Sequence, residues 1–457
     1  MRARHEARRE ARHEVSRRTA LKTLALPAMT GLAGLGAAGC GTAAPTLNVA
    51  VVWTGWELRQ FQRVMDEFTS RYGVGYRLLS MGNNTSAFLD NEVTAAAQPD
   101  VALVPQPGTV IDNRDRLKRV VWPPYDAESW NGLLSGPDGI TQYGTWFKAA
   151  NESMVWHTSG TSAAIPRSGW DWNSWTAWCK AQAKAGRPPL SIGAADGWVL
   201  ADWFANVLLA FHPGTYRSLA SAYRALALGH GSAADIWNLW HDSAIEESLH
   251  RLADLWGTPG LFPGGARRAL ATQFDQSVLD VFATGQAAMV AGADYYWPVI
   301  TQYTRFSPDR VRWFGFPGAA PGQSPAVTSG DAAIWFKRPG GELYGAMLLE
   351  WLGTPEAARI WVRAGGFLSI NELVKPSDYL MAYPTSMRVS ELVTSVQDPV
   401  AEFDLADLLG GPLSGGDGEG AWKIFTDFFT DVAVRRLAPG AAANRAVAAL
   451  ANGESGA

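Results

Sequence analysis

The apolar positions between residues 274 and 298 change period partway along, and each period predicts one element. Phe274, Val278, Val281 and Phe282 are spaced as one face of a helix. Residues 287–290 are all apolar, which is typical of a short strand buried on both faces. The stretch therefore predicts a helix that leads into a buried strand.

Three aromatic residues follow this strand. After a turn at residues 292–294, the chain continues with Tyr295, Tyr296 and Trp297. Aromatics at the end of a buried strand place flat apolar surface at a sheet edge, where open α/β sheets bind their ligands. The alternative is that these rings fill the core, and the pattern alone leaves both interpretations open.

The N-terminal part of the chain alternates the two periods regularly. Apolar runs at 47–53, 76–80 and 101–104 predict strands, and the segments 58–68 and 83–97 predict helices between them. The order strand, helix, strand, helix, strand predicts a parallel sheet with right-handed crossovers. The fold class is therefore α/β.

The loops after these parallel strands lie on one rim of the sheet, so their side chains are candidate ligand contacts. They hold Trp53, Trp56, Glu57, Asn83 and Gln106. A sugar packs the C–H face of its ring on an aromatic plane, and its hydroxyls need paired donors and acceptors. Asn83 can instead cap the following helix, and Glu57 can stabilise the dipole of its own helix.

Residues 1–39 have a composition of their own. They begin with several arginines and end in an apolar run at 24–39 that is too short to span a membrane, so we predict a signal peptide. Arg17 and Arg18 resemble a twin-arginine export signal. Ala20 stands where phenylalanine is usual in that signal, so the general export route stays open.

Residues 37–40 resemble a bacterial lipobox, in which the cysteine is acylated and becomes the mature N-terminus. We therefore expect lipidation of Cys40, followed by a short tether that makes up residues 40–46. Cys40 and Cys179 are the two cysteines of the chain, so a lipid on Cys40 leaves no disulfide. The alternative is an ordinary cleavage that leaves Cys40 incidental.

Length and charge narrow the class of protein. A chain of 457 residues exceeds the size at which one core stops growing, so two lobes are expected. Loss of residues 1–39 removes eight of the 39 basic and three of the 43 acidic residues, which leaves 31 and 40 and a net charge of about −9. This balance argues against nucleic-acid binding.

Motifs for chemistry are few. The sequence has no closely spaced histidine pair, no G-x-S-x-G and no phosphate-binding G-x-x-x-x-G-K-[ST], so nothing favours a metal, hydrolase or nucleotide site. Asp196 and Asp202 could in principle act as the carboxylate pair of a glycosidase.

Four segments occur in an order that resembles the extracellular solute-binding proteins of carbohydrate ABC importers. They are G-W-x-x-x-D-W-F at 197–204, F-x-x-G-x-A-A-M at 282–289, Ser-Gly-Asp at 329–331 and R-x-G-G-F-L-S-I-N at 363–371. Ser329 replaces one glycine of the family's Gly-Gly-Asp, and Ile370 replaces a proline. The resemblance covers nearly all of the mature chain.

This resemblance implies that both halves of the chain contact a sugar. In the family, an aromatic residue after the short strand stacks on a sugar ring, and the first tryptophan of G-W-x-x-x-D-W-F faces the cleft. The residues in the corresponding places are Asn151, Glu152, Trp198, Asp294, Tyr295, Tyr296, Ser329, Asp331, Gly366 and Phe367.

The resemblance also implies two lobes of the periplasmic-binding-protein fold, each a mainly parallel sheet flanked by helices, with the chain crossing between them more than once. We expect the first lobe to hold residues 47–150 and 298–337. We expect the second to hold residues 151–297 and 338–457.

The function implied is that of an exported monomer, anchored to the outer face of the cytoplasmic membrane through its lipid. It would close on a sugar or oligosaccharide and deliver it to the permease and ATPase subunits of an ABC importer, without catalysis, cofactor or metal. One alternative is a secreted glycan-active enzyme. Another is the same fold binding a polyol, an amino sugar or a glycerophosphodiester, although a phosphate calls for arginine and none is among the candidates.

Overall fold

The computed structural model describes residues 45–453, apart from 83–84, 86–97, 122, 124, 128–129, 131, 162–164, 167–168, 339–341, 385–386, 399 and 409–419. The leader, Cys40, Asn83 and nearly all of the helix expected after Asn83 lie outside the described residues. Within the described part of the chain, no helix combines the length and the apolar character that crossing a membrane requires.

The first sheet has six strands and is built around the predicted parallel core. These strands are β1 (Thr46–Val51), β2 (Gly75–Ser80), β3 (Val101–Val104), β4 (Thr145–Asn151), β9 (Val327–Trp335) and β10 (Glu402–Phe403). Their order is β10-β9-β3-β1-β2, with β4 also pairing with β9. Val49 of β1 lies between Leu78 and Val101 in parallel register, as the alternation of strands and helices predicted.

The second sheet has four strands in the order β6-β7-β5-β8. They are β5 (Met154–Thr158), β6 (Leu190–Ser191), β7 (Met289–Gly292) and β8 (Val311–Gly315). The central strand β5 is antiparallel to both β7 and β8, and β6 is parallel to β7. This sheet is therefore mixed, whereas we expected a mainly parallel one.

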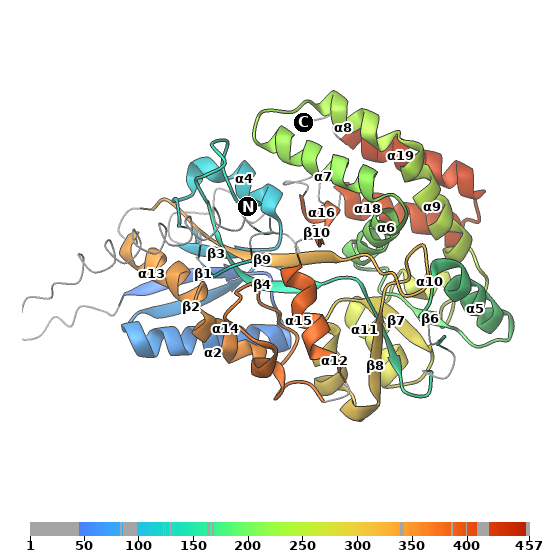
Figure 1. Ribbon diagram of the computed structural model, residues 1–457, viewed down its shortest axis with the longest axis horizontal. Helices are drawn as coiled ribbons and strands as arrows, with labels where there is room; N and C mark the ends of the chain where they lie inside the picture. The colour runs from blue at the N-terminus through green and yellow to red at the C-terminus, as the bar shows by residue number, and fades with distance from the viewer. Residues whose placement is uncertain are drawn as a thin grey trace, which may run out of the picture. The chain divides into compact units, whose positions relative to one another are not determined.

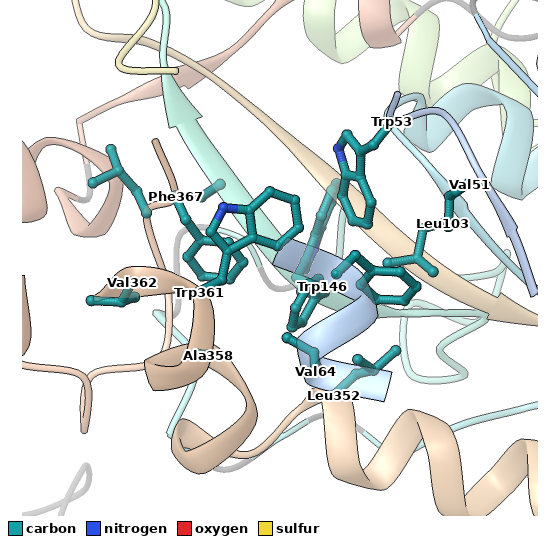
Figure 2. Packing of buried hydrophobic residues seen from close by; sticks show 14 of the residues in the cluster. Val51, Trp53, Val64, Leu103, Trp146, Leu352, Ala358, Trp361, Val362 and Phe367 are labelled. Carbon is teal, nitrogen blue, oxygen red and sulfur yellow. The ribbon is translucent and has the colours of Figure 1, made fainter. Parts of the chain in front are cut away.

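Helices on the first sheet bury their apolar faces in one core. Those that pack with this core are α2 (Gly55–Tyr72), α4 (Pro107–Asp112), α13 (Glu342–Leu352), α14 (Pro355–Val362) and α15 (Val389–Gln397). Figure 2 shows Trp361 of α14 between Phe367 and Trp53, with ring centroids 5.3 and 4.9 Å away. The residues of α2 that face this core, Phe61, Val64, Met65 and Phe68, have the helical spacing expected from the sequence.

Both faces of the second sheet are covered. Neighbouring side chains of a strand point in opposite directions, so successive residues of β5 enter different cores. On one face, Trp156 of β5 stacks on Trp297, 6.4 Å between centroids, near α11 (Phe274–Phe282) and α12 (Tyr296–Tyr303). On the other face, Val155 joins a helical core. The helices that pack together there are α6 (Gly197–Phe211), α9 (Ser243–Trp256), α18 (Gly420–Phe429) and α19 (Pro439–Gly453) (Figure 1).

The remaining described helices belong with this second core or lie beside it. The helices are α5 (Trp172–Lys184), α7 (Pro213–Ala227), α8 (Ala233–Trp240), α10 (Ala266–Ala269) and α16 (Leu405–Leu408).

Two of the expected boundaries differ from the structure. β8 was expected in the first lobe, but it pairs with β5, so the chain returns to the first sheet at β9. Helices α13 and α14 were expected in the second lobe, but they pack on α2, β4 and β9. Pattern alone could not place either element, because apolar periodicity shows that an element is buried and not which sheet it covers.

The aromatic residues after β7 differ from the expected loop as well. Tyr296 and Trp297 begin α12, and both are buried. Tyr296 fills the space beside Gly292, where an added methyl group would clash with its ring.

Replacing Gly292 by alanine should therefore lower the free energy of unfolding by about 1–3 kcal/mol, the usual effect of overpacking a core. Gly214 is the matched control, because its added Cβ would meet open space, and Gly214→Ala should leave stability unchanged or slightly higher. Urea denaturation measures both. Equal stability of the Gly292→Ala variant and the wild type would contradict the close packing of Tyr296.

Candidate ligand-binding cleft

A cleft of about 700 Å³ lies between residues of the first sheet and residues around the second. One wall comes from the segment after β1 and from β4 and β9. The other comes from α6, α11 and α12 and from the segments around α16 and α18. A volume of this size suits a small ligand that both walls enclose.

The segment after β1 places two tryptophans and a carboxylate on the first wall. Trp53, Trp56 and Glu57 all line the cleft. The chain turns sharply into α2 at Gly55, whose φ of 52° favours glycine. Trp53 is also held from behind by Phe61, 5.0 Å between ring centroids, so its ring has a fixed position.

Lys148 of β4 brings a buried ammonium into this wall. Its Nζ lies 2.6 Å from Glu57 Oε1 and 5.1 Å from the centre of the Tyr295 ring. Burial alone would lower the pKa of Lys148, but the carboxylates of Glu57, Asp331 and Asp294 outweigh it and raise that pKa. Lys148 therefore stays charged and holds the acids around it together.

Glu152 lies where the chain passes from the first sheet to the second. The Ser329 hydroxyl donates to Glu152 Oε1, and the Tyr295 hydroxyl donates to Oε2 over 3.4 Å. Burial, reinforced by the nearby charges of Asp294 and Asp404, raises the pKa of Glu152 to about 8 despite the hydrogen bond from Ser329. This carboxyl group joins residues of three separate segments at the floor of the cleft.

Aromatic rings form much of the second wall. Trp198 at the start of α6 lies 5.5 Å from Phe274 and 6.1 Å from Tyr295, measured between ring centroids. All three line the cleft, and Trp422 of α18 lines it too. Their faces offer apolar surface of the kind that packs against a sugar ring.

Acidic side chains lie next to these rings. Asp202 follows Trp198 by one helical turn, so both are on one face of α6, and both line the cleft. Asp404 and Asp407 line it from the start of α16. Asp404 Oδ1 accepts hydrogen bonds from the backbone N–H groups of Ala406 and Asp407 at 2.8 and 3.2 Å.

The structure brings eight of the sequence-derived candidates together along this cleft. They are Trp53, Trp56, Glu57, Glu152, Trp198, Tyr295, Ser329 and Asp331. They come from both walls, as the resemblance implied. Whether each of them contacts a sugar stays a prediction.

Six other candidates lie behind the wall and do not line the cleft. Asn151 and Asp294 bond to each other, with Asn151 N–H donating to Asp294 Oδ1 at 2.9 Å. Gln106 is buried at the start of α4, and its Oε1 accepts from the Thr109 hydroxyl at 3.3 Å. Tyr296 packs on Phe274, 5.7 Å between ring centroids.

Gly366 and Phe367 are the last two of the six. Gly366 approaches Pro298 so closely that a Cβ would clash with it, so its missing side chain makes room for protein and not for ligand. Phe367 is fully buried against Phe147 and Trp361, at 5.1 and 5.3 Å between ring centroids. Asn83 lies outside the described residues.

Several cleft residues were not among the ligand-binding candidates. Lys148, Asp202, Phe274, Asp404, Asp407 and Trp422 all line the cleft. The spacing of Trp198 and Asp202 in the sequence could have identified Asp202. Nothing local in the sequence distinguishes Asp404, because its place depends on the pairing of β10 with β9.

No metal site accompanies the cleft in the described part of the chain. Among those residues, no group of three or more histidine, cysteine, aspartate or glutamate side chains is placed to hold a metal ion.

Two α/β lobes with a ligand-sized cleft between them are the architecture of the class of two-lobed solute-binding proteins. Comparison with known proteins agrees with this class. The bacterial solute receptor AcbH, described as having an exclusive preference for β-D-galactopyranose, shares the fold with a TM-score of 0.67 at 12% identity. The match covers 89% of this chain and 98% of AcbH.

Sequence relatives point to the same class. The osmoprotective compounds-binding protein GgtB of Synechocystis sp. is 22% identical over 401 residues, which cover 84% of this chain and 88% of GgtB. The alpha-glucosides-binding periplasmic protein AglE of Rhizobium meliloti is 22% identical over 415 residues, covering 84% and 83%. No family model matches the chain. The expected resemblance to carbohydrate solute-binding proteins and the two-lobed α/β fold are confirmed.

The buried acids imply that the stability of the protein depends on pH. Burial raises the pKa of Glu152 to about 8, of Asp294 to about 7, and of Asp331 and Asp404 to about 6. Unfolded carboxyl groups titrate at roughly 4. At a pH between the unfolded and the folded pKa of such a group, the folded state therefore binds more protons than the unfolded state. The stability is lost as the pH rises through the folded pKa values.

The free energy of unfolding of the ligand-free protein should therefore rise as the pH falls from 8 to 5. Urea denaturation at pH 5, 6, 7 and 8 measures this. The Glu152→Gln variant has lost one titrating group, so its profile should be flatter. A wild-type profile that rises toward pH 8 would show that these carboxyl groups are not buried in the folded state.

Proposed function

We propose that this protein is an extracytoplasmic receptor that captures a sugar or oligosaccharide in the cleft and delivers it to an ABC importer. The observation that carries the proposal is the cleft itself, to which both lobes contribute aromatic faces and hydrogen-bonding side chains. Relatives that are named as binding proteins for osmoprotective compounds and alpha-glucosides support it. These relatives are consistent with a protein that binds its ligand without catalysis.

Hinge closure is the mechanism that fits this arrangement. A ligand that touches Trp53 and Trp56 on one wall and Trp198 and Tyr295 on the other makes all its contacts only when the lobes are closed. Such a ligand shifts the population toward the closed form by its differential affinity for that form. The permease would then recognise the two lobe surfaces in their closed arrangement.

Calorimetric titration with a panel of α- and β-linked oligosaccharides tests the proposal. We expect at least one member of the panel to bind with a one-to-one stoichiometry. A folded protein that binds none of them would overturn the sugar-receptor function. Release of product from a chromogenic glycoside would instead favour a glycan-active enzyme.

Substitutions of the aromatic residues on the second wall of the cleft test the proposal most directly. Trp198→Ala and Tyr295→Ala should each weaken sugar affinity at least tenfold, or about 1.4 kcal/mol, because each removes a ring that packs on the ligand. Trp237→Ala is the matched control, because Trp237 is 44% exposed and does not line the cleft. Melting temperatures should change little, and unchanged affinity in either variant would remove that residue from the site.

We further propose that the chain is exported, acylated at Cys40 and held as a monomer on the outer face of the cytoplasmic membrane. Export agrees with the relative named as a periplasmic protein. Expressed with its leader in a bacterium, the wild type should sediment with membranes, and Cys40→Ser should not, because serine has no thiol to acylate. Mass spectrometry of the wild type should show the lipid on the N-terminal cysteine. An unmodified Cys40 would exclude the anchor.

A further inference from the structure

The cleft holds more carboxyl groups than the binding of a neutral sugar requires. Its described lining residues include eight carboxylate side chains and one ammonium group. That ammonium, on Lys148, is already paired with Glu57 at 2.6 Å. Most of these carboxyl groups therefore have no cationic side chain beside them among the described lining residues, which points to a positive charge on the ligand.

Four of these carboxyl groups, on Glu152, Asp202, Asp404 and Asp407, act on one another, and we call them the acidic cluster. They come from the crossing between the sheets, from α6 and from the start of α16, and all four line the cleft. The charges that act most strongly on Asp202 and Asp407 are those of other carboxylates, including Glu152 and Asp404. Four acids from three separate segments thus meet in one place without a lysine or arginine among them.

Asp404 shows most directly that a partner is missing. Its Oδ1 caps α16 through two backbone N–H groups. Its Oδ2 has no hydrogen-bond partner among the described residues, although the side chain is only 2% exposed and lines the cleft. A buried acceptor without a donor carries a free-energy cost. A donor supplied by the ligand at this oxygen would remove that cost.

Lys148 shows how this cleft already holds an ammonium group. Its Nζ contacts a carboxylate and lies 5.1 Å from the centre of the Tyr295 ring and 5.8 Å from that of Trp53. Carboxylates and aromatic faces together attract a desolvated cation. The acidic cluster has the same surroundings on the other wall, where Asp202 follows Trp198 on α6 and Glu152 contacts Tyr295.

The alternative is that the cluster stays protonated and bonds to the hydroxyls of a neutral sugar. Burial raises the pKa of Asp404 to about 6, and burial together with neighbouring acids raises that of Asp202. The two backbone N–H groups on Asp404 favour its ionised form, however, and leave Oδ2 as an acceptor. A cation next to the cluster offsets the repulsion that contributes to the raised pKa of Asp202, and a neutral hydroxyl does not.

On the basis of the proposed sugar-binding function, we propose that the ligand is a carbohydrate with a protonated amine. Its ammonium group lies in the acidic cluster and donates to Asp404 Oδ2, and its ring packs on Trp198 and Tyr295. A primary or secondary amine fits because it carries N–H donors. A quaternary ammonium has none to offer this oxygen.

Calorimetric titration of the full mature chain at pH 7 tests this with matched sugars in which an amine replaces a hydroxyl. The pairs are glucosamine with glucose, galactosamine with galactose, and the chitosan disaccharide with cellobiose. We expect the amine of at least one pair to bind ten or more times tighter than its partner. The advantage should shrink as the salt concentration rises, because salt screens the attraction.

Two variants test whether the negative charge of Asp404, and not a general change in the net charge of the protein, favours the amine. Asp404→Asn keeps an oxygen that can cap α16 but removes the negative charge, so it should weaken binding of the amine at least ten times more than binding of its neutral partner. Asp254→Asn is the matched control, because Asp254 on α9 is exposed, does not line the cleft and changes the net charge equally. It should affect both sugars little.

The outcomes distinguish this inference from the function on which it rests. Neutral sugars that bind as tightly as their amine partners would overturn the inference and leave the receptor function standing. Failure of both members of every pair, and of the wider oligosaccharide panel, would overturn the function itself. Choline or glycine betaine that binds as tightly as the amino sugars would also overturn the inference, since neither has a sugar ring.

Discussion

The short crossing from the first sheet to the second is the constraint on which the site depends. β4 ends at Asn151 and β5 begins at Met154, so two residues connect strands of different sheets. The backbone N–H of Asn151 donates to Asp294, that of Ser153 to the Asn151 side chain at 2.8 Å, and that of Glu152 to the Val327 carbonyl at 2.9 Å. Loss of any of these partners would leave a buried donor unsatisfied.

This crossing fixes which side chains reach the cleft. Because strand residues alternate between faces, Lys148, Ala150 and Glu152 line the cleft, and Asn151 lies behind it. The facing strand β9 supplies Ser329 and Asp331 in register with Ala150 and Lys148. The polar residues at the crossing therefore divide into two groups, one that satisfies the backbone and one that lines the cleft.

The sequence predicted the elements better than it predicted the site. Strand β3 at 101–104 and helix α11 from Phe274 to Phe282 occur where the apolar periods indicated. Rim positions such as Trp53 followed from the direction of parallel strands. Phe367 and Tyr295 could not be separated in this way, because a ring in the core and a ring on a cleft wall have the same local pattern. Asp404 could not be predicted for a different reason, since only the long-range pairing of β10 with β9 brings it near Glu152.

The acids of the cleft lie on or beside the segments that connect the two sheets, which would have to move in the proposed hinge closure. Glu152 belongs to the first connection between the sheets, Ser329 follows the second, and Asp404 begins the third. The three connections are tied together, because Val327 accepts from Glu152 and Thr328 accepts from the Asp404 N–H at 2.7 Å. Repulsion between Glu152 and Asp404 therefore acts across the connections themselves. A ligand that neutralises it changes the free energy of the hinge directly, whereas a ligand held only by the aromatic walls acts on the hinge through lobe contact alone.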